Sequence, residues 1–142
     1  MAPFSPRDFY VFALWLVEQK QDEASLRTAI SRLYYACHLW AKAYLVEKRN
    51  WKPAGHGTDH STVIRTLKPG RTQMVSSYLD ALRYLREHAD YHIDATAVGT
   101  EQCIHCKKIR EATSSVLQLV DIAHWENAKS VSEKCVPLLE KL

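Results

Sequence analysis

Apolar residues recur three and four positions apart over most of the chain, which is the spacing of one face of an α-helix. One such stripe comprises Leu26, Ile30, Leu33, Cys37, Trp40, Ala41 and Tyr44. A second comprises Val75, Tyr78, Leu79, Leu82, Leu85 and Ala89. The chain holds only 4 glycines and few turn signals, which favours long helices over many short strands. The pattern predicts an all-α protein.

Start and break signals divide this pattern into a bundle of four principal helices with short additions. Ser5 followed by Pro6 is typical of a helix start, because serine caps and proline fits the first helical position. The predicted long helices cover residues 6–19, 23–48, 72–91 and 100–122. A short helix follows the loop 50–59 and ends at about Leu67. After a weak break at residues 124–129, Ser130 or Ser132 begins a last short helix.

Length and composition fit one soluble domain with a core of its own. The 142 residues are enough for a single domain, and a net charge of +3 permits a nucleic-acid partner without requiring one. The one dense apolar run near the start, residues 9–17, is too short to span a bilayer, and no signal-peptide cleavage pattern follows it. We expect a cytoplasmic protein without a membrane segment, whose four cysteines are reduced.

Charged side chains gather at the end of the third long helix, in LDALRYLREHADYHID (residues 79–94). Arg86 lies about 40° from Leu82 around a helix, so it falls on the apolar stripe. Arg83 and His88 lie further round, towards solvent. Because a buried, unpaired guanidinium is very costly, Arg86 requires a partner or a function. It belongs either to an active site or to a structural polar network.

Two segments of the chain resemble the HEPN domain family. SRLYYACHLWAKAYL (residues 31–45) resembles the small-residue-Arg-x-Tyr-Tyr-Ala signature of the second HEPN helix, and LREHADY (residues 85–91) resembles the Arg-x-x-Ala-Asp-Tyr signature of the third. GHGTDH, between them, resembles the family's His-containing loop before a short helix. The resemblance implies an antiparallel four-helix bundle with a short extra helix between helices 2 and 3. Residues 1–125 would form this bundle, and residues 126–142 a C-terminal helical extension packed on it.

The resemblance also implies a function. Many small prokaryotic HEPN proteins are encoded beside a minimal nucleotidyltransferase as toxin and antitoxin. Active members are metal-independent endoribonucleases that work as dimers through an Arg-x(4–6)-His motif. Arg86 with His92 fits this rule, and so does Arg83 with His88. Toxins of the family often carry a tyrosine two residues after the histidine, whereas Tyr91 here precedes His92.

Three functions follow from this resemblance. The first is a homodimeric endoribonuclease of toxin–antitoxin or defence type that needs no metal or other cofactor. The second is a non-catalytic module that binds RNA or a nucleotide and serves as the partner of a nucleotidyltransferase. The third is a purely structural dimerising subunit.

The candidate site residues have distinct roles in cleavage. A histidine can act as base or acid near neutral pH, and an arginine can grip phosphate with two hydrogen bonds. Arg86 and His92 are the candidate catalytic pair, assisted by His88 and Asp90, and the candidate substrate-binding residues are Tyr91, Tyr35, His60 and Arg83. On a continuous helix Arg86 and His92 would lie about 120° apart, so a shared site requires the helix to end near Tyr91. In the structural alternative, Arg86 pairs with Asp90, and Asp90 and Tyr91 tie the helix end to Tyr34 or Tyr35.

Other candidate ligands are weaker. Cys103 and Cys106 form one CxxC pair, but a structural zinc site needs four ligands and the chain has no second pair, so we predict no metal. The basic residues Arg65, Lys68, Arg71, Lys107, Lys108 and Arg110 are either a path for phosphates or ordinary surface charge.

Overall fold

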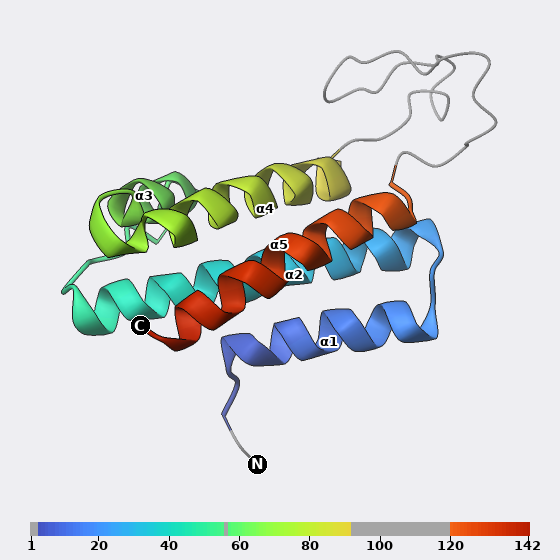
Figure 1. The fold of residues 1–142 in the computed structure, drawn as a ribbon, viewed down its shortest axis with the longest axis horizontal. Coiled ribbons are helices and arrows are strands. Elements are labelled where there is room, and N and C mark those ends of the chain that lie inside the picture. The colour runs from blue at the N-terminus through green and yellow to red at the C-terminus, as the bar shows by residue number, and fades with distance from the viewer. Residues whose placement is uncertain (1–2, 56, 92–119) are drawn as a thin grey trace.

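The structure is a computed structural model, and it describes residues 3–55, 57–91 and 120–142. These residues contain helices and no strand, which confirms the all-α prediction. The helices are α1 (Pro6–Gln19), α2 (Glu23–Lys48), α3 (Asp59–Leu67), α4 (Gln73–Tyr91) and α5 (Ile122–Glu140), with a 3₁₀ turn at Gly70–Thr72 before α4 (Figure 1). Residues 100–119 of the predicted fourth long helix lie outside the described residues.

Local capping explains why α1 begins where the sequence predicts. The Ser5 hydroxyl accepts a hydrogen bond from the Arg7 amide (3.3 Å), and the Asp8 carboxylate accepts one from the Ser5 amide (2.9 Å). Pro6 occupies the first turn, where its missing N–H is not needed. The same rules placed the starts of α2 and α3 correctly.

The predicted break at residues 124–129 is wrong, because α5 runs without interruption from Ile122 to Glu140. Asp121 caps this helix reciprocally with His124: each residue's amide donates to the other's side chain, at 3.1 and 3.2 Å. Four of residues 124–129 are polar, but the segment contains no glycine or proline to stop a helix. Trp125 and Ala128 are buried in the core. The boundary expected at residue 125 therefore falls inside a core helix.

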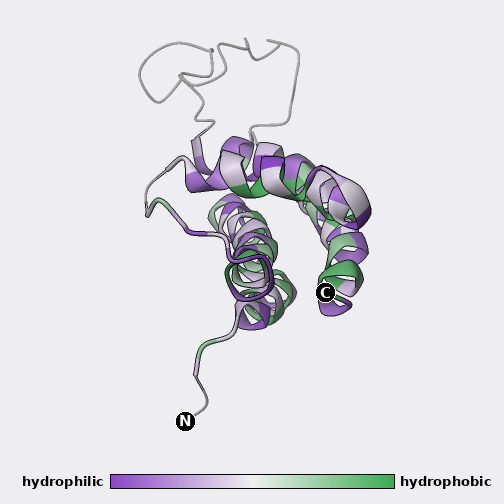
Figure 2. Ribbon diagram, turned by 90° about the vertical axis from the view of Figure 1, so that its left-hand side faces the viewer, coloured by the Kyte–Doolittle hydropathy of each residue, from purple (hydrophilic) through white to green (hydrophobic). Residues whose placement is uncertain are grey.

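The four long helices are α1, α2, α4 and α5, and in chain order each runs opposite to the one before it (Figure 1). Helix α2 is central, because it packs against α1, α4 and α5, while α4 and α5 also pack against each other. The short helix α3 rests on the first half of α4. Hydrophilic and hydrophobic residues mix along the helices, as expected for amphipathic helices (Figure 2).

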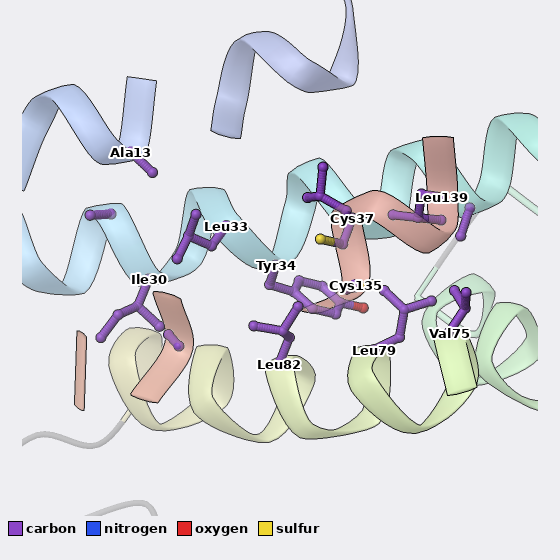
Figure 3. Packing of buried hydrophobic residues seen from close by; sticks show 14 of the residues in the cluster. Ala13, Ile30, Leu33, Tyr34, Cys37, Val75, Leu79, Leu82, Cys135 and Leu139 are labelled. Carbon is purple, nitrogen blue, oxygen red and sulfur yellow. The ribbon is translucent and has the colours of Figure 1, made fainter. Parts of the chain in front are cut away.

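The core is built mainly around α2 (Figure 3). Its fully buried side chains include Leu33, Tyr34 and Cys37, which share one core cluster with apolar residues from four other helices, among them Val63 and Leu67 of α3. Helix α1 contributes Ala13 and Val17, α4 contributes Val75, Leu79 and Leu82, and α5 contributes Trp125, Cys135 and Leu139. Among the described helices, none is long and apolar enough to cross a membrane.

A pair of charged residues in the first turn of α2 connects this helix to two distant parts of the chain. Glu23 and Arg27 form an ion pair at 3.3 Å. Arg27 also donates to the carbonyl of Ala89 in the last turn of α4 (2.7 Å), and Glu23 accepts from the Val120 amide just before α5 (2.9 Å). One turn of α2 therefore holds both the end of α4 and the start of α5.

Candidate functional site at the α2–α4 seam

Polar and aromatic side chains replace apolar ones where α2 crosses the end of α4. We call this group the α2–α4 seam: Ser31, Tyr34 and Tyr35 from α2, with Arg86, Asp90 and Tyr91 from α4. The six residues come from the two segments that carry the sequence signatures. The seam therefore joins parts of the chain that lie more than 50 residues apart.

Arg86 is the buried centre of the seam, with 6% of its surface exposed. Its guanidinium donates to the Tyr91 hydroxyl (3.3 Å) and pairs with the Asp90 carboxylate (3.5 Å). The guanidinium carbon lies 5.3 Å from the ring centre of Tyr34, and 5.6 Å from those of Tyr35 and Tyr91. Aromatic faces attract such a cation, so the rings partly compensate its lost hydration. Arg86 is thus buried on the apolar stripe and has partners, while its Nε has no hydrogen-bond partner among the described residues.

Asp90 is held from α2 as well as from its own helix. The Ser31 hydroxyl donates to the Asp90 carboxylate at 3.3 Å, so this carboxylate lies between Ser31 and Arg86. Together with the bond from Arg27 to the Ala89 carbonyl, this interaction fixes the last turn of α4, whose carbonyls have no partner within the helix. The structural alternative expected Tyr34 or Tyr35 in this place, and Ser31 is the residue that bonds Asp90.

A histidine pair lies behind Tyr34. The Tyr34 hydroxyl forms a 2.6 Å hydrogen bond with Nδ1 of His60. The His60 ring stacks on that of His38, with 4.4 Å between the ring centres, and these two residues are the histidine pair. Burial, reinforced by the nearby His60, lowers the pKa of His38 to about 3. Burial and then the charge of Arg86 lower the pKa of His60 as well. His38 is 4% exposed, and its Nδ1 has no hydrogen-bond partner among the described residues.

Asp59 positions His60 by anchoring the start of α3. Its buried carboxylate accepts hydrogen bonds from the amides of Ala54 (2.8 Å) and Gly55 (3.0 Å), and it pairs with Lys42 of α2 (3.3 Å). Burial alone would raise the pKa of Asp59, but these bonds outweigh it and the pKa is lowered. Gly55 has a φ of 81°, which a residue with a side chain rarely adopts. The loop thereby fixes α3 against α2.

The surface around buried Arg86 carries cations and rings. Arg32 lies over the ring of Tyr35, with 4.9 Å from its guanidinium carbon to the ring centre. Arg83, one turn before Arg86, is partly exposed and pairs with Glu87 at 3.4 Å. Tyr91 is 50% exposed. This rim offers flat aromatic faces and positive charge, the two features that bind nucleic-acid bases and phosphates.

Comparison with known proteins finds similarity to an archaeal protein. The chain is 32% identical to uncharacterized protein MJ0628 of Methanocaldococcus jannaschii over 111 residues, which cover 66% of this chain and 67% of the relative. The chain belongs to the family of this archaeal protein. No family model matches the chain, and no solved structure matches it. The name of this relative states no activity, so the relative supplies no function for the chain.

The structure brings together most of the predicted site residues, but not His88. Arg86, Asp90, Tyr91 and Tyr35 meet in the seam, His60 joins them through Tyr34, and Arg83 lies on the rim. His88 stacks instead on His124 of α5, with 4.8 Å between ring centres. Side chains two residues apart on a helix point in directions that differ by about 160°, so His88 points away from Arg86.

Several predicted residues cannot be placed. His92, Cys103 and Cys106 lie outside the described residues. Within residues 3–55, 57–91 and 120–142, no group of three or more histidine, cysteine, aspartate or glutamate side chains could hold a metal ion. The two described cysteines, Cys37 and Cys135, are free thiols, as predicted for them.

Sequence reasoning missed Arg27, Ser31 and His38 as parts of the site. Ser31 is the small residue that opens the tyrosine-rich signature of α2, and Arg27 precedes it by one helical turn. Both therefore share the α2 face that carries Tyr34 and Tyr35, and this spacing is the signal that could have identified them. His38 continues the same face by one further turn.

Proposed function

We propose that the chain is a HEPN-type protein with an antiparallel four-helix arrangement of α1, α2, α4 and α5. Two observations support this fold. The tyrosine pair of one HEPN-like signature contacts the Arg86 of the other, as expected if both belong to a shared structural core. In addition, the short helix α3 lies between α2 and α4 in the chain, where the resemblance expects it.

We further propose that the seam surface binds RNA or a nucleotide without cleaving it. The burial of Arg86 carries this proposal. To reach a phosphate, this guanidinium would have to leave Asp90 and the tyrosine rings, and separating a buried charge pair is expensive. Arg86 thus acts as a positioning residue that holds the rim in place. The rim contacts the ligand, with Tyr91 exposed and Tyr35, Arg32 and Arg83 half-buried: the two tyrosines stack on bases, and the two arginines pair with phosphates.

The lowered pKa values of His38 and His60 argue against either histidine as a general base near neutral pH. A general base works best when its pKa is close to the working pH. The pKa of His38 is lowered to about 3 and that of His60 is lowered too, so both rings are neutral and weakly basic at neutral pH. Following the HEPN resemblance, we propose a nucleotidyltransferase as the protein partner of this module.

A metal-independent endoribonuclease of toxin–antitoxin or defence type is the second candidate. The position of Arg86 favours it, because Arg86 lies in the last turns of the described part of α4 and precedes His92 by six residues. In this mechanism His92 takes the proton of the 2′-hydroxyl, and the 2′-oxygen attacks the phosphorus to form a 2′,3′-cyclic phosphate. The bond to the 5′-oxygen breaks, and this oxygen leaves as a hydroxyl with a proton from water, while Arg86 stabilises the phosphorane charge. Asp90 then fixes the orientation of Arg86.

One experiment separates the two candidates. Purified protein is mixed with fluorescein-labelled single-stranded RNA in EDTA, and both anisotropy and strand length are recorded. The binding function predicts intact RNA and a Kd that rises about tenfold in Tyr35→Ala and in Tyr91→Ala, since each loses one stacked base. Trp15→Ala, which removes an exposed aromatic ring of α1, is the matched control and should bind normally.

Each outcome has a distinct meaning. RNA cleavage that disappears in His92→Ala, but not in Trp15→Ala, would replace the binding function by the endoribonuclease. RNA binding that is unaffected by Tyr35→Ala and Tyr91→Ala would show that RNA does not bind at the seam. Neither binding nor cleavage would overturn both candidates.

We also propose a homodimer, as the HEPN resemblance implies. Light scattering after size exclusion gives the mass directly, and the proposal expects twice the 16.3 kDa of one chain. A mass of one chain at every concentration tested would contradict it.

A further inference from the structure

A hollow of 460 Å³ lies between α3 and α4, beside the rim of the seam. Arg65 and Lys68 line it from the end of α3, and Ser77, Asp80 and Arg83 line it from α4. Three cations thus face one carboxylate, which gives the hollow a net positive charge. Its volume is within the range of small-ligand sites, and it is large enough for one nucleotide.

Hydrogen bonds between the walls hold this hollow open in a fixed shape. The Ser76 hydroxyl of α4 donates to the carbonyl of Ile64 in α3 at 2.7 Å. The Thr72 hydroxyl donates to the carbonyl of Leu67 at the end of α3 at 2.6 Å. Ser76 and Thr72 are both buried. Because these hydrogen bonds join α3 to α4 on both sides of the turn, the hollow is preformed and a ligand need not order its walls.

A second, smaller hollow of 240 Å³ continues the first along α4. It shares Asp80 and Arg83 with the larger hollow and adds Tyr84 and Glu87. Tyr84 is 63% exposed. Tyr84 and Tyr91 are seven residues apart, which places them about 20° apart around the helix and about 10 Å apart along it. The two exposed rings therefore line one face of α4, leading from the hollows to the seam.

We propose that the two hollows and the rim of the seam form one track for single-stranded RNA. Arg65 and Lys68 hold a phosphate in the larger hollow, and Tyr84 stacks on the next base. This inference rests on the proposed function, because the track ends at the Tyr91 of the seam. A strand fits better than a single nucleotide, since the second hollow shares two residues with the first and adds a stacking surface.

Asp80 gives the track its preference for RNA over DNA. A carboxylate beside phosphates is unfavourable unless it accepts hydrogen bonds from the ligand. The ribose 2′-hydroxyl is such a donor, and it is the group that distinguishes RNA from DNA. Acidic side chains recognise ribose hydroxyls in the same way in dinucleotide sites. Asp80 thereby accepts the 2′-hydroxyl of the nucleotide in the larger hollow.

The test compares binding of a fluorescein-labelled oligouridylate with that of the corresponding deoxyuridylate, measured by anisotropy at several salt concentrations. Arg65→Gln/Lys68→Gln should weaken binding of both strands about tenfold and reduce the slope of the salt dependence by about one for each phosphate that is no longer bound. Asp80→Asn should instead bring the two Kd values within about twofold of each other, because it removes the charged acceptor of the 2′-hydroxyl. Lys20→Gln/Lys134→Gln, which removes two exposed lysines elsewhere, is the charge-matched control.

The results separate this inference from the proposed function. If Tyr35→Ala and Tyr91→Ala weaken RNA binding while Arg65→Gln/Lys68→Gln binds like its control, the seam binds RNA and the track is wrong. If Asp80→Asn keeps the full preference for RNA, the assignment of the 2′-hydroxyl to Asp80 is wrong. If uridine monophosphate binds but the oligouridylate does not, the site holds a nucleotide and no strand. If the wild-type protein binds neither, the proposed function fails together with the track.

Discussion

Helix α2 packs against α5 and against α4 with different chemistry. On the α5 side, Cys37 and Cys135 are fully buried, and a hydrogen bond between the two thiols, with burial, raises the pKa of Cys37. The Cys37 thiol therefore stays protonated, and both buried cysteines pack as small apolar groups. On the α4 side, the apolar packing of Val75 and Leu79 gives way to the polar seam at Arg86.

The comparison shows that the two interfaces serve different purposes. An apolar interface stabilises the fold without needing any exact partner, whereas a buried ion pair stabilises little more than an apolar pair of similar shape. The seam instead fixes positions, because Arg86 is held by both Asp90 and Tyr91, and Asp90 is held by both Ser31 and Arg86. The α5 side therefore keeps the bundle folded, and the α4 side keeps the rim residues in a defined arrangement.

The largest effect should come from the apolar side. Leu139 of α5 is 2% exposed, so Leu139→Ala leaves a cavity and should lower the free energy of unfolding by about 3.5 kcal/mol. Urea denaturation followed by circular dichroism measures this change. RNA binding by the fraction that remains folded should be unchanged. Weakened binding would show that the two sides of α2 are not independent.

A smaller loss of stability is expected when the seam loses its centre. Arg86→Ala should lower the free energy of unfolding by about 2.5 kcal/mol, because Asp90 is left without its cation and the tyrosine rings no longer face a guanidinium. Unlike Leu139→Ala, it should also weaken RNA binding by the folded protein. The same urea titration, paired with anisotropy, tests both effects. Full stability in Arg86→Ala would mean that Arg86 is free to act in chemistry.

Lowering the pH should destabilise the packing of α2 against α3 and α4 at a pH above the range in which carboxylates titrate. The pKa of His38 is about 3 in the folded protein and about 6.5 in the unfolded chain, so below pH 6.5 the unfolded chain binds more protons. The stability that neutral His38 contributes is fully present above pH 6.5 and is lost as the pH falls towards 3. From pH 7 to pH 5 the free energy of unfolding should fall by about 2 kcal/mol, and the lowered pKa of His60 acts in the same direction.

His38→Phe provides the control for this acid effect. It keeps a ring that can stack on His60 and removes the group that titrates. The variant should lose clearly less stability over the same pH range, as measured by urea denaturation at each pH. An equal loss in His38→Phe and wild type would assign the effect to other groups.

The smallest effect is expected for Arg83, only one turn from Arg86. Its ion pair with Glu87 is partly exposed, with 30% and 39% of the two side chains accessible. Arg83→Ala should therefore change the free energy of unfolding by less than about 0.5 kcal/mol. A thermal melt beside Arg86→Ala measures the contrast. A large loss in Arg83→Ala would show that the polar network extends beyond the seam.

Most of the described helices could be predicted from the sequence, because local signals determine where helices begin and end. Ser5, Pro6 and the polar residues before α2 and α3 act within one turn, so their effect can be read without knowing the fold. The burial of Arg86 could also be predicted, because Arg86 lies on an apolar stripe of its helix. The continuity of α5 could not, since tertiary burial of Trp125 decides it.

The partners within the site required the structure. The bond from Ser31 to Asp90 depends on how far α2 is shifted along α4, and helical periodicity contains no such information. The stacking of His38 on His60 likewise depends on the loop that Asp59 anchors. The place of His88 is different, because helix geometry alone separates its direction from that of Arg86 by about 160°.

The ion pair of Glu23 and Arg27 works as a cross-link between distant parts of the chain. Arg27 binds the Ala89 carbonyl and Glu23 binds the Val120 amide, so one turn of α2 holds two points that are 31 residues apart (120 − 89). Because the two side chains also hold each other, the loss of either Glu23 or Arg27 should loosen the end of α4 and the start of α5 together.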